Sequence, residues 1–288
     1  MCDNCGCGHT DHFHVHPGSA KDHPHPDHHH PHEHHHHGPA HDHGDHGHPH
    51  ESDHGWHAHT AADGSVSWHS HGDHGAQPIL DANQREAERN RGYFRARGIV
   101  ALNLVSSPGS GKTTLLRATL DRLHERVGCA VVVGDLETQA DAEALRPSGA
   151  PVVQITTGTV CHLDARMVAA AVDTLPKEGV RLLFIENVGN LVCPASFDLG
   201  EAHRIVLLAA TEGENKPLKY PPIFHGARAV VISKTDLAGP AGFDIPQARQ
   251  AIAQVAPAAE IIELSSRTGD GLDAWIALLD RLLETAAH

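Results

Sequence analysis

The segment "GIVALNLVSSPGSGKTTLLRATLDRL", residues 98–123, limits the possible folds of this chain more than any other feature. Its apolar run at about 99–105 predicts a strand, and a loop of serine, proline and glycine leads from it into a helix that opens at Lys112. Gly109 and Gly111 let the backbone close around phosphate oxygens at the positive end of that helix. This order predicts a Walker-type phosphate loop. Ser106 stands where the motif has its first glycine, so a glycine-rich turn before an ordinary helix stays open as the alternative.

Further apolar runs predict the other strands of the same sheet. They are continuous rather than alternating, which is typical of strands buried on both faces. Helical patterns lie between several of them, and the chain is expected to form an α/β fold, a doubly wound and mostly parallel sheet of the P-loop type, with ligands at the carboxyl ends of the strands. The predicted strands are 129–134, 152–156, 181–186, 204–209, 229–233 and 260–264, and the predicted helices include 81–97, 162–174, 244–256 and 271–286.

The amino-terminal quarter has a different composition. Of the 30 histidines, 25 lie between His9 and His74, and residues 1–75 hold one basic residue against 11 acids. Few aliphatic side chains accompany them, so burial cannot offset the entropy of ordering the backbone. The expected organisation is a cysteine motif at 1–8, a disordered histidine-rich tail at 9–75 and a nucleotide-binding domain at 76–288.

Charge and hydropathy exclude two classes of partner. The formal net charge of −14 leaves no basic face of the kind that nucleic acids require. No apolar run approaches the roughly 20 residues that cross a membrane, and the first residues lack the regions of a signal peptide. A cytoplasmic protein is expected, and in a reducing compartment the cysteines favour a metal or redox role over disulfides.

The phosphate loop and two acidic strand ends predict the catalytic centre. Lys112 would reach the β- and γ-phosphates, Thr113 would ligate Mg²⁺, and Asp135 and Glu186 end strands at the same edge. We expect Lys112, Asp135 and Glu186 to be catalytic, with Thr113, Asp135 and Glu186 as magnesium ligands. The remaining phosphate-loop contacts are expected from Gly109, Ser110, Gly111 and Thr114.

The run that begins at Glu186 resembles the Asp-x-x-Gly switch segment of GTPases, with Glu in place of Asp. Gly189 could then contact a γ-phosphate and release it after hydrolysis. No glutamine directly follows Gly189 to orient the attacking water. Slow intrinsic turnover is therefore expected.

The sequence "SKTD", residues 233–236, predicts which base is bound. It resembles the Asn-Lys-x-Asp motif of GTPases, in which the carboxylate, here Asp236, accepts from guanine N1–H and N2–H₂, a donor pair that adenine lacks. The stem of Lys234 would lie along the base, and the loop at Ser265 and Ser266 would help to hold it. These features favour GTP over ATP, although Asp236 alone could cap a helix.

Two cysteines and a histidine follow predicted strands in the same domain. Cys161 and His162 are adjacent, and Cys193 stands seven residues after Glu186. Loops after parallel strands emerge at one edge, so the three could converge, and thiolate with imidazole suits Zn²⁺ or Ni²⁺. Lone Cys and His residues are, however, more often packed than ligating, and Cys129 reads as a buried apolar residue.

Five motifs together resemble a known family. In chain order they are "LVSSPGSGKTT", "GDLETQADA", "TTGTVCHLDA", "IENVGNLVCPA" and "VVISKTDL". They resemble the hydrogenase nickel-incorporation GTPases, the HypB group of the HypB/UreG family in the SIMIBI class. The opening "CDNCGC" resembles the nickel motif that some members carry. The related urease GTPases have Cys-Pro-His where this chain has Cys193, Pro194 and Ala195, which disfavours a urease assignment.

This resemblance implies a metallochaperone that uses GTP-dependent dimerisation and hydrolysis to time nickel delivery to the precursor of the [NiFe] hydrogenase large subunit. A HypA-type nickel and zinc accessory protein would be its partner, besides the homodimer. By the same resemblance, Cys161, His162 and Cys193 are the metal ligands of the nucleotide-binding domain. The alternatives are a nickel storage or detoxification protein and delivery to urease.

The amino terminus predicts two further kinds of metal site. Cys2, Cys5 and Cys7, with a chain-terminal amine, could form one four-coordinate Ni²⁺ site, and a zinc knuckle is the alternative. The many histidines of the tail are mostly neutral at pH 7 and suit the buffering of several Ni²⁺ or Zn²⁺ ions. An affinity tag does not fit histidines that are scattered among Asp, Gly and Pro.

Overall fold

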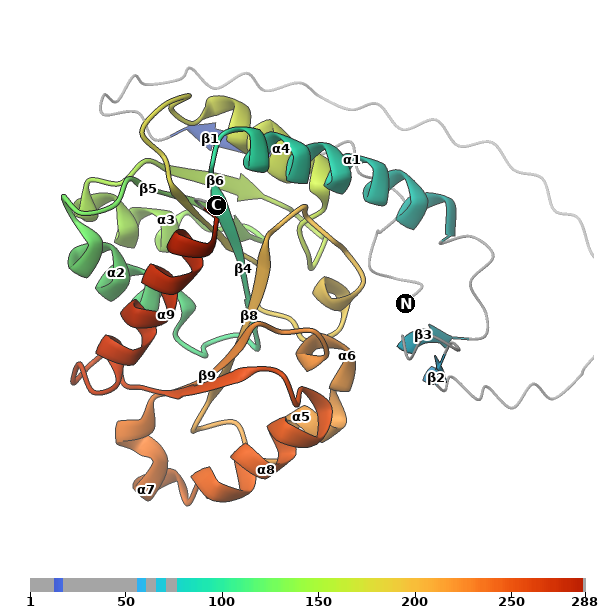
Figure 1. The fold of residues 1–288 in the computed structure, drawn as a ribbon, viewed down its shortest axis with the longest axis vertical. Coiled ribbons are helices and arrows are strands. Elements are labelled where there is room, and N and C mark those ends of the chain that lie inside the picture. The colour runs from blue at the N-terminus through green and yellow to red at the C-terminus, as the bar shows by residue number, and fades with distance from the viewer. Residues whose placement is uncertain (1–12, 18–55, 61–65, 71–76, 287–288) are drawn as a thin grey trace, which may run out of the picture. The chain divides into compact units, whose positions relative to one another are not determined.

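The seven predicted strands form the parallel part of one sheet (Figure 1). The computed structural model describes residues 13–17, 56–60, 66–70 and 77–286. The strand order is β1-β6-β5-β7-β4-β8-β9-β10, so the phosphate-loop strand β4 lies between β7 and β8. The parallel strands are β4 (Val100–Ser106), β5 (Cys129–Asp135), β6 (Val152–Thr156), β7 (Leu182–Glu186), β8 (His203–Ala209), β9 (Ala229–Ser233) and β10 (Glu260–Glu263).

Helices cover both faces of this sheet because successive strand residues point to opposite faces. In β4, Leu102 and Leu104 pack with α2 and α9 on one face, whereas Ala101 packs with α1 and α4 on the other. The doubly wound fold expected from the sequence is confirmed. The helices are α1 (Gln77–Ala96), α2 (Lys112–Leu123), α3 (Ala140–Leu145), α4 (Ala165–Thr174), α5 (Lys216–Lys219), α6 (Pro221–Phe224), α7 (Ala238–Ala241), α8 (Ile245–Val255) and α9 (Leu272–Thr285).

An eighth strand comes from the histidine-rich region and differs from the expectation of disorder over 9–75. Strand β1 (His14–Pro17) pairs antiparallel with the edge strand β6, with His14 opposite Thr156 and Pro17 opposite Val153. Phe13 and Val15 pack against the core cluster beneath α4, and the Arg166 guanidinium lies 5.4 Å from the centre of the Phe13 ring. These contacts and the hydrogen bonds to β6 stabilise β1, although the composition of the region predicts no ordered strand.

Residues 19–74 form a separate unit. Within it, β2 (Trp56–Thr60) and β3 (Val66–Ser70) pair as an antiparallel hairpin, which also differs from the predicted disorder. The cysteine motif at 1–8 and most of the histidine-rich region lie outside the described residues. Among the described residues, no helix is both long and apolar enough to cross a membrane.

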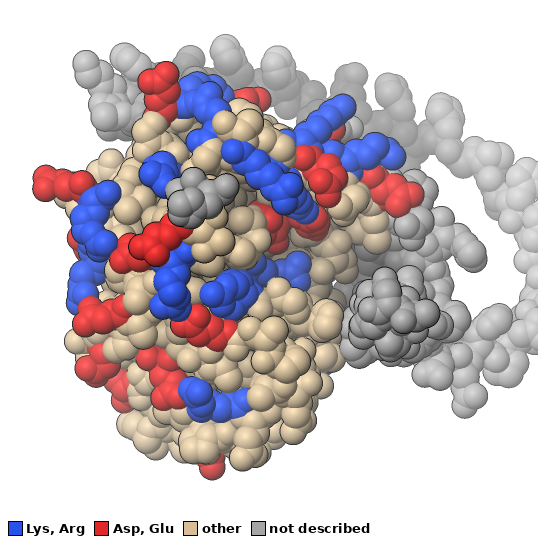
Figure 2. Space-filling model, in the orientation of Figure 1, with Lys and Arg blue, Asp and Glu red and all other residues tan. Residues whose placement is uncertain are grey.

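Surface charges of both signs alternate along the packed helices. Figure 2 shows Lys and Arg side chains interspersed with Asp and Glu on the face that carries α2 and α9. Arg122, in the last turn of α2, and Arg126, just beyond that helix, approach Asp273 and Asp280 of α9 at 2.7 and 3.2 Å. Exposed pairs of this kind contribute little to stability. Packing fixes α9 instead, since Trp275 is fully buried and donates to the Thr119 hydroxyl at 2.9 Å.

Candidate functional site

The loop between β4 and α2 has the backbone of a phosphate-binding loop. Gly109 and Gly111 adopt positive φ angles of 71° and 96°, which side chains disfavour. Gly111 is the N-cap of α2, and no side chain in the described part of the chain caps the helix, so its first amide groups are available to an anion. Ser106 has no positive φ, which explains why serine is tolerated where the motif has glycine.

Ser106 also holds the lysine of the loop. Lys112 is buried and donates from Nζ to the Ser106 hydroxyl oxygen at 2.9 Å, and Ser110 donates to the same oxygen at 2.5 Å. Burial lowers the pKa of Lys112, while the Glu186 and Asp141 carboxylates oppose that shift. A bound phosphate would add the negative charge that such a buried cation lacks.

The first turn of α2 brings a hydroxyl to two carboxylates. Thr113 Oγ1 lies 2.8 Å from Glu186 Oε1 and 2.9 Å from Asp141 Oδ1. Burial raises the pKa of Glu186 to about 7 despite the nearby Lys112, and Glu186 Oε2 is buried without a hydrogen-bond partner among the described residues. An oxygen set with an unsatisfied buried member fits Mg²⁺, a hard cation. Thr113, Glu186 and Asp141 would hold it.

Asp141 was not among the predicted ligands. It lies in the first turn of α3, where an acidic residue ordinarily complements the helix dipole, so its sequence position gave no signal. Asp135, which was predicted, ends β5, but its carboxylate accepts from the Leu136 amide and the Thr138 hydroxyl. Its role in magnesium binding stays a prediction.

The predicted switch segment lies directly against the phosphate loop. A Cβ atom at Gly189 would be 2.8 Å from the Pro108 Cα atom, so only glycine fits there. Lys216, which sequence reasoning missed, donates to the Ser107 hydroxyl at 2.8 Å and pairs with Glu212 at 3.0 Å. It comes from α5, a four-residue helix outside the motifs. Thr114, which follows Thr113 in α2 and was predicted to contact the phosphates, is exposed.

The residues predicted to recognise the base are held in place by hydrogen bonds to neighbouring residues. Asp236 accepts from the Ser265 hydroxyl at 2.6 Å and from Arg267 Nε at 3.1 Å. The Ser265 hydrogen bond lowers the pKa of Asp236, which keeps the side chain a carboxylate acceptor. Lys234 has a positive φ of 58° and donates from Nζ to the Gly109 carbonyl at 2.6 Å, so its stem crosses to the phosphate loop. Ser266 is half-buried beside Ser265.

The predicted convergence of Cys161, His162 and Cys193 is confirmed. Their ligand atoms all lie within 4.8 Å of one another, and the two sulfur atoms are 3.0 Å apart, too far for a disulfide bond. Cys161 lies in the loop after β6, and Cys193 begins the short 3₁₀ helix η2 (Cys193–Ala195) after β7. β5 pairs with both β6 and β7, which brings the two loops to the same edge.

His162 has the chemistry of a ligand rather than of a cation. It is 3% exposed and stacks on Phe197, with 3.9 Å between the ring centres. Burial lowers its pKa to about 4, so the imidazole is neutral at pH 7. Its Nδ1 atom has no hydrogen-bond partner among the described residues. Two thiols and one neutral imidazole with a bare nitrogen fit Ni²⁺ or Zn²⁺.

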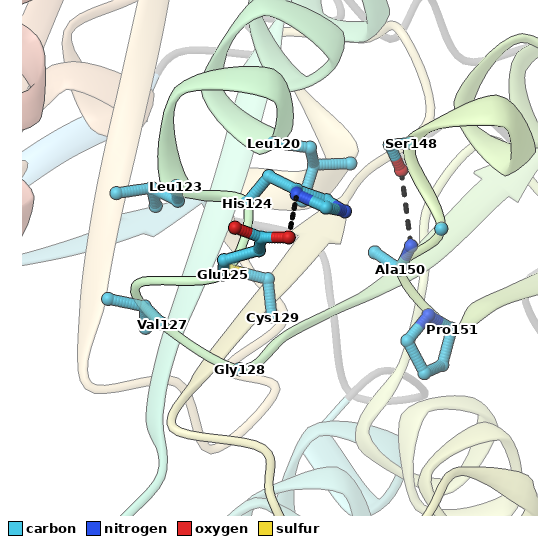
Figure 3. Close-up of a pocket in the computed structure, with 11 residues that line it drawn as sticks. Leu120, Leu123, His124, Glu125, Val127, Gly128, Cys129, Ser148, Ala150 and Pro151 are labelled. Atoms are coloured by element: carbon cyan, nitrogen blue, oxygen red, sulfur yellow. Dashed lines mark hydrogen bonds and ion pairs between the residues drawn. The ribbon is translucent and has the colours of Figure 1, made fainter.

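A separate hollow of about 220 Å³ lies at the opposite end of the strands (Figure 3). Its walls come from the end of α2, the start of β5 and the turn before β6, and they include Leu123, His124 and Pro151. Cys129 also lines it, and burial raises the pKa of this thiol to about 12. The hollow is remote from the phosphate loop, and Cys129 agrees with the prediction of a buried apolar residue.

The fold and the phosphate loop define a P-loop nucleotide-binding protein. Residues 100–263 match the family model for the CobW/HypB/UreG nucleotide-binding domain. The chain is 52% identical over 202 residues to the hydrogenase maturation factor HypB of Escherichia coli K12, covering 70% of both chains. The chain belongs to the hydrogenase maturation factor HypB family.

Solved structures agree with this assignment. HypB from Archaeoglobus fulgidus superposes with a TM-score of 0.66 at 40% identity, over 70% of this chain and 99% of that one. HypB from Helicobacter pylori, solved in complex with nickel, gives 0.68 at 41% identity, over 71% and 97%.

Proposed function

We propose that the protein is a GTP-hydrolysing metallochaperone that delivers nickel to the [NiFe] hydrogenase precursor. One observation carries this proposal: the loop that holds Cys193 of the metal cluster begins directly after Glu186, the last residue of β7, and includes Gly189, which packs against the phosphate loop. A change at the γ-phosphate is thus adjacent to the cargo site. The relative from Helicobacter pylori was solved in complex with nickel.

The base loop supports GTP as the nucleotide. Asp236 is held as a carboxylate and can accept two hydrogen bonds from guanine. Lys112 would stabilise charge on the β- and γ-phosphates, and Mg²⁺, when bound, would neutralise more of it. Asn190, and not a glutamine, directly follows Gly189, so the position that would orient water lacks its usual residue, which supports slow intrinsic hydrolysis.

The cluster leaves room for a second protein in the cargo site. Three ligands are one short of a closed tetrahedral site, and Val192, beside Cys193, is 50% exposed although it is apolar. A second copy of the chain, or a HypA-type accessory protein, would cover Val192 and complete the coordination. The proposed setting is the cytoplasm, where hydrogenase precursors are loaded.

The function is tested by measuring nickel affinity and dimerisation with GTP, a non-hydrolysable analogue and GDP. Nickel should transfer to the accessory protein only when hydrolysis is possible. Cys193→Ala should weaken nickel binding at this site by more than about 100-fold, since loss of a supporting contact alone costs 10- to 100-fold. Cys129→Ala is the matched control, because Cys129 begins β5 and so lies at the end of the strands opposite to the metal cluster. Equal transfer in all three nucleotide states would leave only storage.

Storage is a second candidate role, and the composition of the tail favours it. Residues 19–74 hold 21 histidines and form their own unit. Deleting them should lower nickel capacity by about five ions if each ion takes four imidazoles, with the rate of GTP hydrolysis unchanged within about twofold. This deletion keeps β1 on the sheet. Equilibrium dialysis checks the prediction, and an unchanged stoichiometry would exclude storage in this region.

A further inference from the structure

A buried asparagine joins the switch to the metal loop. Asn187 follows Glu186 directly and is 1% exposed. Its Oδ1 atom accepts from the Leu163 amide at 3.2 Å and from the Val188 amide at 2.9 Å. Leu163 follows the metal-cluster residue His162 in the chain. A single side chain therefore fixes the backbone of both loops.

The path from magnesium ligand to metal ligand is short. Thr113 donates to Glu186, Asn187 is the next residue, and the Leu163 amide that it accepts adjoins His162. The side-chain nitrogen of Asn187, Nδ2, donates to Asn103 Oδ1 at 3.3 Å. Asn103 lies on β4, the strand that leads into the phosphate loop. Since both ends of the Asn187 amide are bonded in a buried site, a displaced switch must move the metal loop or break a buried hydrogen bond.

A second asparagine on the same loop repeats the connection. Asn190 Nδ2 donates to the Cys161 carbonyl at 3.4 Å, and its Oδ1 accepts from the Val192 amide at 2.8 Å, next to Cys193. Gly189, which touches Pro108 of the phosphate loop, lies between the asparagines. The segment from 187 to 190 thus contacts the phosphate loop at its centre and the metal loop at both ends.

The other side of the metal loop is packed against β5 and bonded to α1. Leu163 is fully buried against β5, where a Cβ atom at Gly134 would lie 2.8 Å from the Leu163 side chain. From α1, Asn83 accepts the Ala165 amide at 2.8 Å. Packed elements of this kind shift between discrete arrangements rather than deform gradually.

We propose that Asn187, assisted by Asn190, is the positioning residue that makes nickel binding and nucleotide binding depend on each other. This rests on the proposed function and deepens it. Reciprocity requires that if nucleotide state alters metal affinity by some factor, metal alters the preference for GTP over GDP by the same factor. The asparagines would carry that factor without touching either ligand.

The test measures binding of a fluorescent non-hydrolysable GTP analogue and of GDP to the full chain, with and without saturating NiCl₂. In the parent protein, nickel should change the ratio of the two affinities by roughly 5-fold or more, the lower range of allosteric couplings. Cys193→Ala should abolish that change, which assigns it to the metal cluster. Asn187→Ala and Asn190→Ala should also reduce it to less than about twofold.

Asn83→Ala is the matched control, because Asn83 also accepts a backbone amide from the start of α4 but does not belong to the switch loop. A merely structural asparagine changes stability and both affinities, but not their nickel-dependent ratio. The half-buried Asn190 carries the test if Asn187→Ala does not fold. Parent-like coupling in the asparagine variants overturns this inference alone. Absence of coupling in the parent overturns the proposed function with it.

Discussion

Lys112→Ala is expected to lower kcat/KM for GTP hydrolysis by about 100- to 1000-fold, the usual cost of removing one preorganised donor to developing charge. The lysine is buried and already hydrogen-bonded to Ser106, so the free energy of desolvating this cation is spent on folding, before a phosphate binds. Magnesium and the loop amides would not replace it, because none of them would occupy the position of its ammonium group beside Ser106. Phosphate release at saturating and subsaturating GTP measures the change.

Lys177→Ala is the control for loss of a positive charge. Lys177 is exposed and forms an i,i+4 ion pair with Asp173 at 3.3 Å. Removing its charge should leave the rate of hydrolysis unchanged. A loss of less than 10-fold for Lys112→Ala would contradict the assignment of this loop as the phosphate site.

Asp236→Asn is expected to change which base is bound. The carboxylate accepts from two guanine donors, whereas an amide offers one acceptor and one donor group. Xanthine carries a carbonyl where guanine has its amino group, so the amide can donate to it. Affinity for GTP should fall by about 100-fold or more, because sites that hydrogen-bond a polar group strongly reject partners that lack the match. Affinity for XTP should rise.

Competition of GTP, XTP and ATP against fluorescent GDP measures this exchange. Ser265 can still donate to the carbonyl oxygen of the amide that the substitution introduces, and the lost pair with exposed Arg267 should matter little. ATP should stay weak in the parent and in the variant. If GTP and XTP keep the same order of affinity in both, Asp236 does not recognise the base.

The sequence predicted the parts of the site that local pattern determines. Continuous apolar runs predict the parallel strands. Because these strands run in the same direction, the loops after them meet at one edge, which predicts the convergence of Cys161 and Cys193. The phosphate loop was recognised from glycine spacing, and the φ angles of Gly109 and Gly111 agree with its backbone. These features depend on residues near one another in the chain or on a rule that all parallel sheets obey.

The missed features depend on tertiary placement. Asp141 has the local pattern of an ordinary helix-start residue, and only the packing of α3 beside α2 brings it to Thr113. Asn187 reads as an unremarkable switch residue until Leu163 is seen beside it. Strand β1 carries few apolar residues, and it pairs His14 with Thr156, a residue far away in the sequence. No local pattern encodes such a distant partner.

The direction of β1 sets an upper limit on the distance between Cys7 and the sheet edge that carries Cys161. Because β1 runs antiparallel to β6, His14 lies at the Thr156 end, five residues before Cys161. The seven residues from Cys7 to His14 span at most about 25 Å when fully extended. Tethers of this length give local concentrations on the order of millimolar. With β1 paired to β6, a metal ion bound by Cys7 would stay within this distance of the sheet edge that carries Cys161 and Cys193, so its transfer there would not require diffusion through solvent.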